Sequence, residues 1–454
     1  MKKAILYILA VVTITASSCE KLINKLPTDA QPGDEVLKSA GNVLAVLASS
    51  YNRFADGNFL GGEIQRTAEL YGDQLDLSNA TGGAPAQFVS RQFNTFNQQG
   101  RDIWITGYEA IARANTVLGA IESAAFSDTS AAAKASWKGE ALFIRGVAHF
   151  ELVRIYAKPY TSSPATNPGV VLRLKALTAS ETQVEAQRST VQQTYDAVIA
   201  DLKQAESLLP ATNGVRATKW AAKAYLARIY FSMADYANAY TYANDVIENG
   251  GFSLGDDVTS VFKTNGNITQ VPAGAVYMVL GDAGRLRGNF WNSNLDNTFL
   301  PLGSNIAQTI STKGGTRKTS LTAIAPNDKS VSLKWSQLQD GAVNVPIIRL
   351  AEMYLIRAES SVLKGGFADA DVRADYNAVR AVAGVDADET TTGAEALLTA
   401  IRTEREVEFF TEGMSYHELR RLKAQVRGIA YDDAKGLLKI PDGEVRVNPS
   451  MIQN

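Results

Sequence analysis

Cysteine and histidine are nearly absent from this chain of 454 residues. Cys19 is the only cysteine, so the chain cannot form an internal disulfide. The two histidines, His149 and His417, lie within helical patterns, and neither has the spacing of a metal ligand. We therefore expect each histidine to be structural or at the surface, and we expect no bound metal and no cofactor.

The common catalytic motifs are also missing. The chain has no Gly-x-Ser-x-Gly elbow, no phosphate-binding loop and no dinucleotide fingerprint. Its 45 basic and 47 acidic residues give a net charge of −2, without a basic stripe, so we do not expect a nucleic-acid partner. Binding functions and carboxylate chemistry remain open.

The first 18 residues have the pattern of a lipoprotein signal peptide. Lys2 and Lys3 precede an apolar run that is too short to span a bilayer as a helix. Ala16-Ser17-Ser18-Cys19 is typical of a lipobox, although Ala16 stands where leucine is usual. We expect Cys19 to carry the lipid; the alternative is an ordinary secretory signal with an incidental cysteine. Residues 19–34 then form the lipidated N-terminus and a tether, about 15 residues that reach roughly 50 Å when extended.

Apolar spacings of three and four residues predict a mainly helical body. The predicted helices cover 35–55, 102–123, 131–156, 190–209 and two helices within 217–250. The last pair resembles a tetratricopeptide repeat, because Leu226–Tyr230 fits its first helix and Ala239 follows Ala227 by twelve residues. Ala358 and Ala370 repeat that spacing. We predict about four helix pairs, with a generic helical bundle as the alternative.

Two long stretches interrupt the helical pattern. Residues 56–101 and 251–345 are rich in glycine and polar residues, and inserts of this length are usually functional. Ala275–Leu280 in the second insert predicts a buried β-strand. Residues 157–189 are expected to be irregular.

The segment after Pro346 predicts two further helices. Ile347, Ala351, Tyr354, Ala358 and Val362 recur at helical spacing, so we expect a helix that begins at about Pro346 and is mostly buried. The second helix is expected to start at a capping box formed by Thr392 and Glu395, to run to Phe410 and to stop near Gly413.

This C-terminal region resembles the SusD/RagB family of nutrient-binding outer-membrane lipoproteins. The resemblance rests on four separated motifs that follow one another in the family's order. They are Pro346–Glu359, Tyr376–Arg380, Glu404–Gly413 and the ending Ile440–Glu444 with Asn448-Pro449 and Gln453-Asn454. One departure is Met414–Arg420, where the family usually has arginine and an aromatic residue, followed by Asp-Leu and arginine.

The resemblance implies a tetratricopeptide-like scaffold that carries a loop-rich ligand subdomain with short strands. Residues 35–454 would form this SusD-like domain, with helical repeats at about 35–55, 102–156, 190–250 and 346–425. The inserts at about 56–101 and 251–345 would form the ligand subdomain. It further implies a lipid-anchored protein on the outer face of the outer membrane. Its partner would be a SusC-like TonB-dependent barrel, and its ligand a glycan or, in RagB-like members, a peptide.

Carboxylates of the Glu404–Gly413 motif could in principle serve a glycosidase. Glu404, Glu408 and Glu412 recur at one helical turn, with Arg405, Arg420 and Arg421 nearby to neutralise them. We favour a structural ion-pair network that joins two helices. A surface glycoside hydrolase remains an alternative function, as does a periplasmic repeat scaffold, but we expect no enzyme.

The inserts supply the candidate ligand-binding residues. A sugar site needs exposed aromatic rings together with amides and charged groups. The residues that meet this description are Tyr71, Asp73 and Phe88 in the first insert and Arg287, Trp291 and Asn292 in the second. The competing interpretation for each aromatic residue, including Trp335, is burial in a loop core.

Overall fold

The computed structural model describes residues 37–78, 80, 83–178, 181, 184–263, 268–281, 300–325, 328–335 and 344–454. The expected signal peptide, Cys19 and the tether lie outside these residues, as do Arg287, Trp291 and Asn292. Within the described part, no helix is both long and apolar enough to cross a membrane.

The fold is mainly helical. The helices are α4 (Ala40–Phe54), α5 (Glu63–Tyr71), α6 (Gly83–Ser90), α7 (Gln98–Glu122), α8 (Ala131–Tyr156), α9 (Val191–Leu208), α10 (Lys219–Ser232), α11 (Tyr236–Asn249), α13 (Ser304–Lys313), α14 (Thr316–Ser320), α15 (Leu350–Lys364), α16 (Asp369–Val382), α17 (Ala394–Glu408), α18 (Ser415–Arg421) and α19 (Asp442–Val447). Two short 3-10 helices are η2 (Ser260–Phe262) and η3 (Ala434–Gly436). The strands are β1 (Ala275–Val279), β2 (Thr322–Ile324), β3 (Ser330–Ser332) and β4 (Val345–Arg349).

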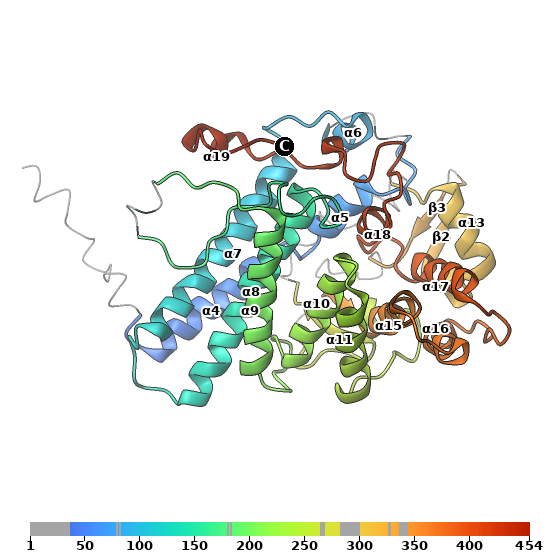
Figure 1. The fold of residues 1–454 in the computed structure, drawn as a ribbon, viewed down its shortest axis with the longest axis horizontal. Coiled ribbons are helices and arrows are strands. Elements are labelled where there is room, and N and C mark those ends of the chain that lie inside the picture. The colour runs from blue at the N-terminus through green and yellow to red at the C-terminus, as the bar shows by residue number, and fades with distance from the viewer. Residues whose placement is uncertain are drawn as a thin grey trace, which may run out of the picture.

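Four helix pairs form the scaffold, as the sequence predicts. They are α4 with α7, α8 with α9, α10 with α11, and α15 with α16. Each pair also packs on the next through α7 with α8, α9 with α10, and α11 with α15, so the pairs form a row across the molecule (Figure 1). In such an array each repeat buries its apolar face against its neighbours.

Local sequence explains where these helices start and how closely they pack. Ser39, Asn97, Ser130 and Thr218 each accept a hydrogen bond from a backbone N–H in the first turn of α4, α7, α8 and α10 respectively. The small residues Ala227 and Ala239 are both fully buried, which allows α10 and α11 to approach closely. The same spacing of twelve residues does not place two small residues in the contact between α15 and α16, because Ala358 is buried but Ala370 is exposed.

Three predictions for the C-terminal region are wrong. The helix predicted from Pro346 begins only at Leu350, and residues 345–349 form β4, which pairs antiparallel with β1. All five residues of β4 are buried. A short buried strand has the same continuous apolar character as a buried helix, so periodicity alone could not separate them.

The expected capping box is also absent. Gly393, with φ at 83°, is the N-cap of α17, and no side chain caps that helix. Helix α17 ends at Glu408 rather than Phe410, and Gly413 lies beyond it with φ at +80°.

The two inserts lie side by side, and the residues that join them are more than 200 positions apart in sequence. Leu75 forms an antiparallel bridge with Leu302, the Asp76 N–H donates to the Pro301 carbonyl at 2.8 Å, and the Gly303 N–H donates to the Gln74 carbonyl at 2.7 Å. The first insert is less irregular than expected, since it contains α5 and α6. In contrast, the expected irregular segment at 157–189 contains neither a helix nor a strand in its described residues.

Candidate ligand-binding site

The charged residues of the C-terminal motifs form a buried ion-pair network rather than a catalytic pair. Arg317 of α14 donates to Glu404 and Glu408 of α17, each at 2.6 Å, and its side chain is fully buried. Arg349 of β4 bonds Glu408 and also Glu412, the latter at 2.8 Å. Lys334 reaches Glu412 at 2.6 Å.

The network was predicted, but its cations were not. Arg317, Arg349 and Lys334 neutralise the three glutamates, whereas Arg405, Arg420 and Arg421 have other partners. Arg405 bonds Glu418 at 2.6 Å. Arg421 bonds Glu359 and Glu418 at 2.9 and 2.8 Å, and Arg420 donates to backbone carbonyls, including that of Ala157 at 2.7 Å. The predicted cations lie close to the glutamates in sequence, whereas the observed ones come from segments up to 91 residues away.

The electrostatics agree with a structural role. Burial alone would raise the pKa of the Glu408 carboxyl, but Arg317, Arg349 and Lys334 lower it to about 2. Burial lowers the pKa of Lys334 to about 8, although Glu412 opposes this shift. The charged residues of the first motif serve the same purpose, since Glu352 accepts two hydrogen bonds from Arg228 of α10, at 2.8 and 2.6 Å.

Neither histidine belongs to a site. His149 is 1% exposed, and its ring lies between the carbonyl of Arg145 at 2.9 Å and the N–H of Arg173 at 3.2 Å. Burial lowers the pKa of His149 to about 3, so it stays neutral. Burial likewise lowers the pKa of His417, so both rings are expected to be neutral.

The structure does not present Tyr71 or Phe88 to a ligand. Both are fully buried, and their rings pack at 4.8 Å in a cluster that also contains Phe93 and Tyr416. Trp335 is 3% exposed and donates its indole N–H to the Thr411 carbonyl at 2.8 Å. For these three residues the loop-core interpretation describes the observed packing. The exposed aromatic residue of the first insert is Phe96, at 69%, which the sequence analysis did not single out.

Asp73 does lie in a pocket. It is exposed, accepts a hydrogen bond from the Ser415 hydroxyl at 2.7 Å, and lines a hollow of about 260 Å³ between the first insert, α17 and α18. The apolar wall consists of Phe409, Met414, Leu419 and Leu422. The polar wall consists of Asp73, Gln74, Arg402, Arg405, Glu406, Ser415 and Glu418. We call this hollow the Asp73 pocket.

Glu406 is the acid that faces Asp73 across this pocket. Partial burial and the negative charge of Asp73 raise the pKa of Glu406, while Lys313 opposes the shift. Gln74 is 6% exposed, and its side-chain oxygen has no hydrogen-bond partner among the described residues. The pocket thus combines an apolar wall with carboxylate, amide and guanidinium groups that can bind sugar hydroxyls. Its one aromatic residue, Phe409, is only 4% exposed, so the apolar face of a sugar would contact mainly the aliphatic side chains of the wall.

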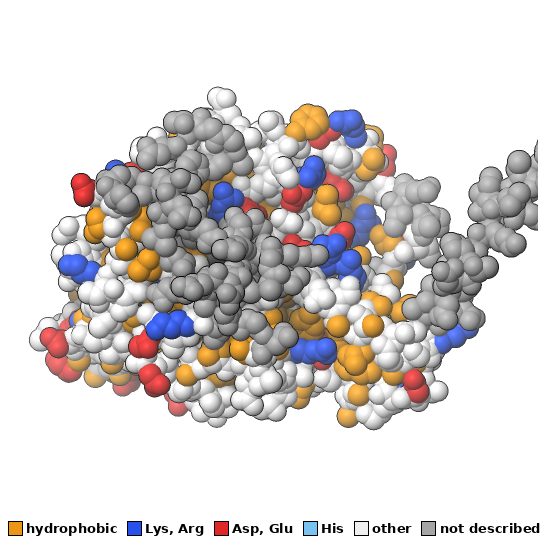
Figure 2. Space-filling view, turned by 180° about the vertical axis from the view of Figure 1, so that it is seen from behind, with side chains coloured by type: hydrophobic (Ala, Val, Ile, Leu, Met, Phe, Trp, Pro, Cys, Tyr) orange, Lys and Arg blue, Asp and Glu red, His pale blue; other side chains and the backbone are white. Residues whose placement is uncertain are grey.

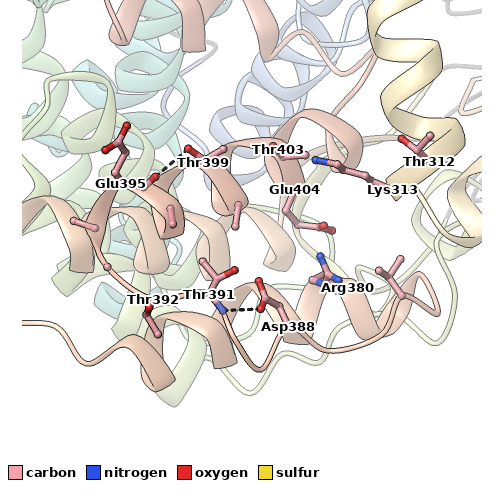
Figure 3. A pocket seen from close by; sticks show the side chains of 15 residues that line it. Thr312, Lys313, Arg380, Asp388, Thr391, Thr392, Glu395, Thr399, Thr403 and Glu404 are labelled. Carbon is pink, nitrogen blue, oxygen red and sulfur yellow. Dashed lines mark hydrogen bonds between the residues drawn. The ribbon is translucent and has the colours of Figure 1, made fainter.

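A second and larger hollow lies on another side of α17. It has a volume of about 960 Å³ and is formed by α13, α17 and the loop between α16 and α17 (Figure 3). Five threonines line it, namely Thr312, Thr391, Thr392, Thr399 and Thr403. We call it the threonine groove. In Figure 3 the Glu404 carboxylate lies between the side chains of Lys313 and Arg380.

Both hollows share α17 as a wall. Thr399 and Thr403 line the threonine groove, and Arg402 and Glu406 line the Asp73 pocket. Positions three and four apart lie on neighbouring stripes of a helix, so one extended ligand could contact both hollows by crossing α17. These residues were not predicted as ligand contacts, because the helix that contains them was expected to belong to the scaffold. The run Thr390-Thr391-Thr392 is the feature of the sequence that could have indicated a polar groove.

The charges of the described residues visible in Figure 2 do not suggest a polyanionic ligand. On the face shown in Figure 2, Lys and Arg side chains are scattered among Asp and Glu side chains and do not gather into one patch. A polyanion would need a continuous basic surface.

Comparison with known proteins agrees with this architecture. A family model described as "Starch-binding associating with outer membrane" matches residues 29–231, and one described as "SusD family" matches residues 217–436. A "SusD-like protein" of Bacteroides ovatus is 28% identical over 196 residues, which cover 40% of this chain and 34% of the relative. "SusD-like protein P2" of Formosa agariphila is 24% identical over 262 residues, which cover 56% of this chain and 49% of the relative. The match therefore spans half or less of these curated relatives.

Solved structures share the fold over nearly the whole chain. A "putative sugar binding protein" of Bacteroides vulgatus superposes with a TM-score of 0.79 at 22% identity, covering 92% of this chain and 99% of that one. A SusD superfamily protein of Bacteroides thetaiotaomicron gives a TM-score of 0.78 at 21% identity, covering 91% and 99%. The two family models, which together cover residues 29–436, and the helical architecture lead to one conclusion: the chain belongs to the SusD/RagB family.

Proposed function

We propose that this protein captures a carbohydrate at the cell surface and delivers it to a SusC-like TonB-dependent barrel, over which it closes as a lid. Its lipid anchor would be Cys19, and its ligand would lie in the Asp73 pocket and extend across α17 into the threonine groove. The observation that carries the proposal is the pocket chemistry, an apolar wall together with three carboxylates, two guanidinium groups, an amide and a hydroxyl. The family and the sugar-binding description of one structural relative support it.

The pocket has the size of a single sugar ring. A hollow of about 260 Å³ can hold one ring with its exocyclic groups, and the adjoining groove of about 960 Å³ has room for several more. Hydroxyl, carboxylate and amide groups bind sugar hydroxyls as donors and acceptors, while the side chains of Met414, Leu419 and Leu422 can cover the apolar ring face. This arrangement favours an oligosaccharide over a monosaccharide.

Delivery to the barrel would use a different surface. We propose that the helical repeats face the barrel and the inserts face the ligand. Charge reversal on the exposed faces of the repeats should then break co-purification with the barrel. Loss of co-purification only in insert variants would contradict this orientation.

The peptide-binding alternative makes a different prediction for the same pocket. Short peptides would bind instead of oligosaccharides, and the two exposed carboxylates would select basic ones. The hydrolase alternative was based on Glu404, Glu408 and Glu412. These carboxylates do not support it, because they form ion pairs with Arg317, Arg349 and Lys334.

Calorimetry on the soluble form, residues 20–454, tests the function directly. Oligosaccharides of several linkages and then short peptides would be titrated into the protein and into Asp73→Asn and Glu406→Gln variants. We expect saccharide binding that weakens roughly tenfold in either variant, about 1.4 kcal/mol, which is the usual size for one lost hydrogen bond to a charged group.

The matched control is Glu122→Gln, which makes the same change at a side chain that is 66% exposed at the end of α7. It should leave the affinity unchanged. Saccharide binding that is unaffected in both pocket variants would move the site elsewhere, with Trp291→Ala as the next variant. Peptide binding without saccharide binding would refute the carbohydrate assignment.

A further inference from the structure

A second groove lies far from the Asp73 pocket, along the outer side of α7. It has a volume of about 800 Å³ and is bounded by α7, residues 171–177 with Val184, and α19 with the residues that follow it. Its α7 wall runs from Trp104 to Thr116, and Val184, Val447 and Met451 line it from the other elements. We call it the outer groove.

Exposed apolar side chains concentrate around the outer groove. Among the described residues, eight large apolar side chains are exposed, and three of them, Ile105, Val184 and Val447, line the groove, with exposures of 44%, 66% and 77%. Three more adjoin it in sequence or space: Leu174, Ile452 and Phe96, over whose ring the Arg446 guanidinium of α19 lies at 5.9 Å. An apolar cluster of this kind usually marks an interaction site.

The rim aliphatics favour a polypeptide over a sugar as the occupant. Trp104, the largest aromatic residue of the groove, is only 2% exposed, so its ring is not available for stacking. Its indole N–H bonds the Glu444 carboxyl, whose pKa is raised by partial burial. The charge of Arg173, which also lines the groove, opposes this shift, but no described cation forms an ion pair with Glu444, so a lysine in the occupant could do so.

We propose that the outer groove holds the apolar segment Leu22–Leu26 of the same chain. This segment is Leu22-Ile23-Asn24-Lys25-Leu26, flanked by Lys21 and Pro27, and no other part of residues 20–36 has comparable apolar content. Its three aliphatic side chains are apolar like those of the rim, and in the docked state one of its lysines would pair with Glu444. In an extended conformation it is about 17 Å long, and the α7 wall from Trp104 to Thr116 is about 18 Å long.

Chain geometry permits the contact. The Ala40 N–H at the start of α4 donates to Asp128 at 2.9 Å, so the N-terminal segment leaves the body close to the C-terminal end of α7. From there the wall of the groove begins about 9 Å and ends about 27 Å along α7. Residues 27–36 can span about 33 Å, which is sufficient to place Leu26 and the residues before it against the wall.

The contact would change how the protein sits on the membrane. Cys19 precedes Leu22 by three residues, so docking would hold the expected lipid attachment beside α7 and α19 and would remove most of the free length of the tether. The body would then have a fixed orientation at the membrane while docked, and full freedom only after release.

Site-specific photo-crosslinking in the full chain tests the proposal. A benzoylphenylalanine would be placed at position 447, and at position 105 as a second reporter, in protein purified in detergent with its own N-terminal segment. The matched control is position 324, because Ile324 is 70% exposed on β2, away from the groove. Mixing isotope-labelled and unlabelled chains separates contacts within a chain from contacts between copies.

We expect crosslinks from positions 447 and 105 to residues 20–27 of the same chain, at least tenfold above the control at position 324. Leu22→Asp combined with Ile23→Asp should abolish them while the melting temperature stays unchanged. Crosslinks no stronger than those of the control, or crosslinks only to a second copy or to another protein, would overturn the proposal. Because no glycan is involved, these outcomes are independent of the carbohydrate titrations.

Discussion

The buried network around Arg317 gives the sharpest stability prediction. Arg317→Met keeps much of the side-chain volume but leaves Glu404 and Glu408 facing each other across one helical turn, with exposures of only 3% and 8%. Removing one partner of a buried pair costs about 3–5 kcal/mol, because the remaining charge keeps its desolvation cost. With an unfolding entropy of about 2.1 cal/mol/K per residue, a loss of about 4 kcal/mol lowers the Tm of a chain of this size by roughly 4 °C.

Urea denaturation and thermal melting at pH 7 measure this loss. The control Arg446→Met removes the same side chain from an ion pair with Asp442 in which Arg446 is 70% exposed, and should cost under about 0.5 kcal/mol. Adding Glu404→Gln to Arg317→Met should recover part of the loss, because Glu408 still has Arg349. A loss below about 1 kcal/mol for Arg317→Met would refute the reasoning, since it would mean that the carboxylates are not charged and buried together.

Three further predictions concern pH, backbone and packing. The Glu408 pKa of about 2 lies below its ordinary value of 4.5, so its stabilisation is present above pH 4.5 and is lost as pH falls toward 2. Urea midpoints from pH 6 to pH 3 should therefore fall less steeply in Glu408→Gln than in the unmodified protein. Gly413→Ala should lower the unfolding free energy by about 2 kcal/mol more than Gly428→Ala. Both glycines have φ at +80°, but a Cβ at Gly413 would lie 2.7 Å from a Cα of α5, whereas Gly428 has open space. Ala227→Leu should cost about 1–3 kcal/mol by overfilling the α10–α11 contact, and Ala370→Leu, at an exposed position, should be nearly neutral in the same melts.

The scaffold could be predicted from sequence because its signals are local. The predicted helix 131–156 agrees with α8 residue for residue, and the helices at 102–123 and 190–209 differ from α7 and α9 by a few residues. The residues that determine apolar periodicity, and those that form the turns between helices, are neighbours in the sequence. Strand β4 was missed because its pairing with β1 joins positions about 70 residues apart, and pairing of that kind leaves no local trace.

The site was harder to predict because it is made from non-local contacts. Asp73 faces Glu406 only because α17 packs beside the first insert, and the cations of Glu404 and Glu408 come from α14 and β4. Composition identified the inserts as the polar and aromatic part of the chain, but it could not tell exposed rings from buried ones. Tyr71 and Phe88 became core residues, while Phe96, a few positions later, stayed at the surface.

The ion-pair network also joins the second insert to the helical scaffold. Arg317 and Lys334 belong to the second insert, and their carboxylate partners belong to α17 and the turn that follows it. These two anchor points hold α14 and the residues after β3 against α17 and the turn that follows it. With the insert attached at these two points, we expect its outer loops to tolerate replacement while the attachment stays unchanged. Grafting foreign insert loops while Arg317 and Lys334 are retained is therefore a practical route to altered ligand selectivity on an unchanged helical frame.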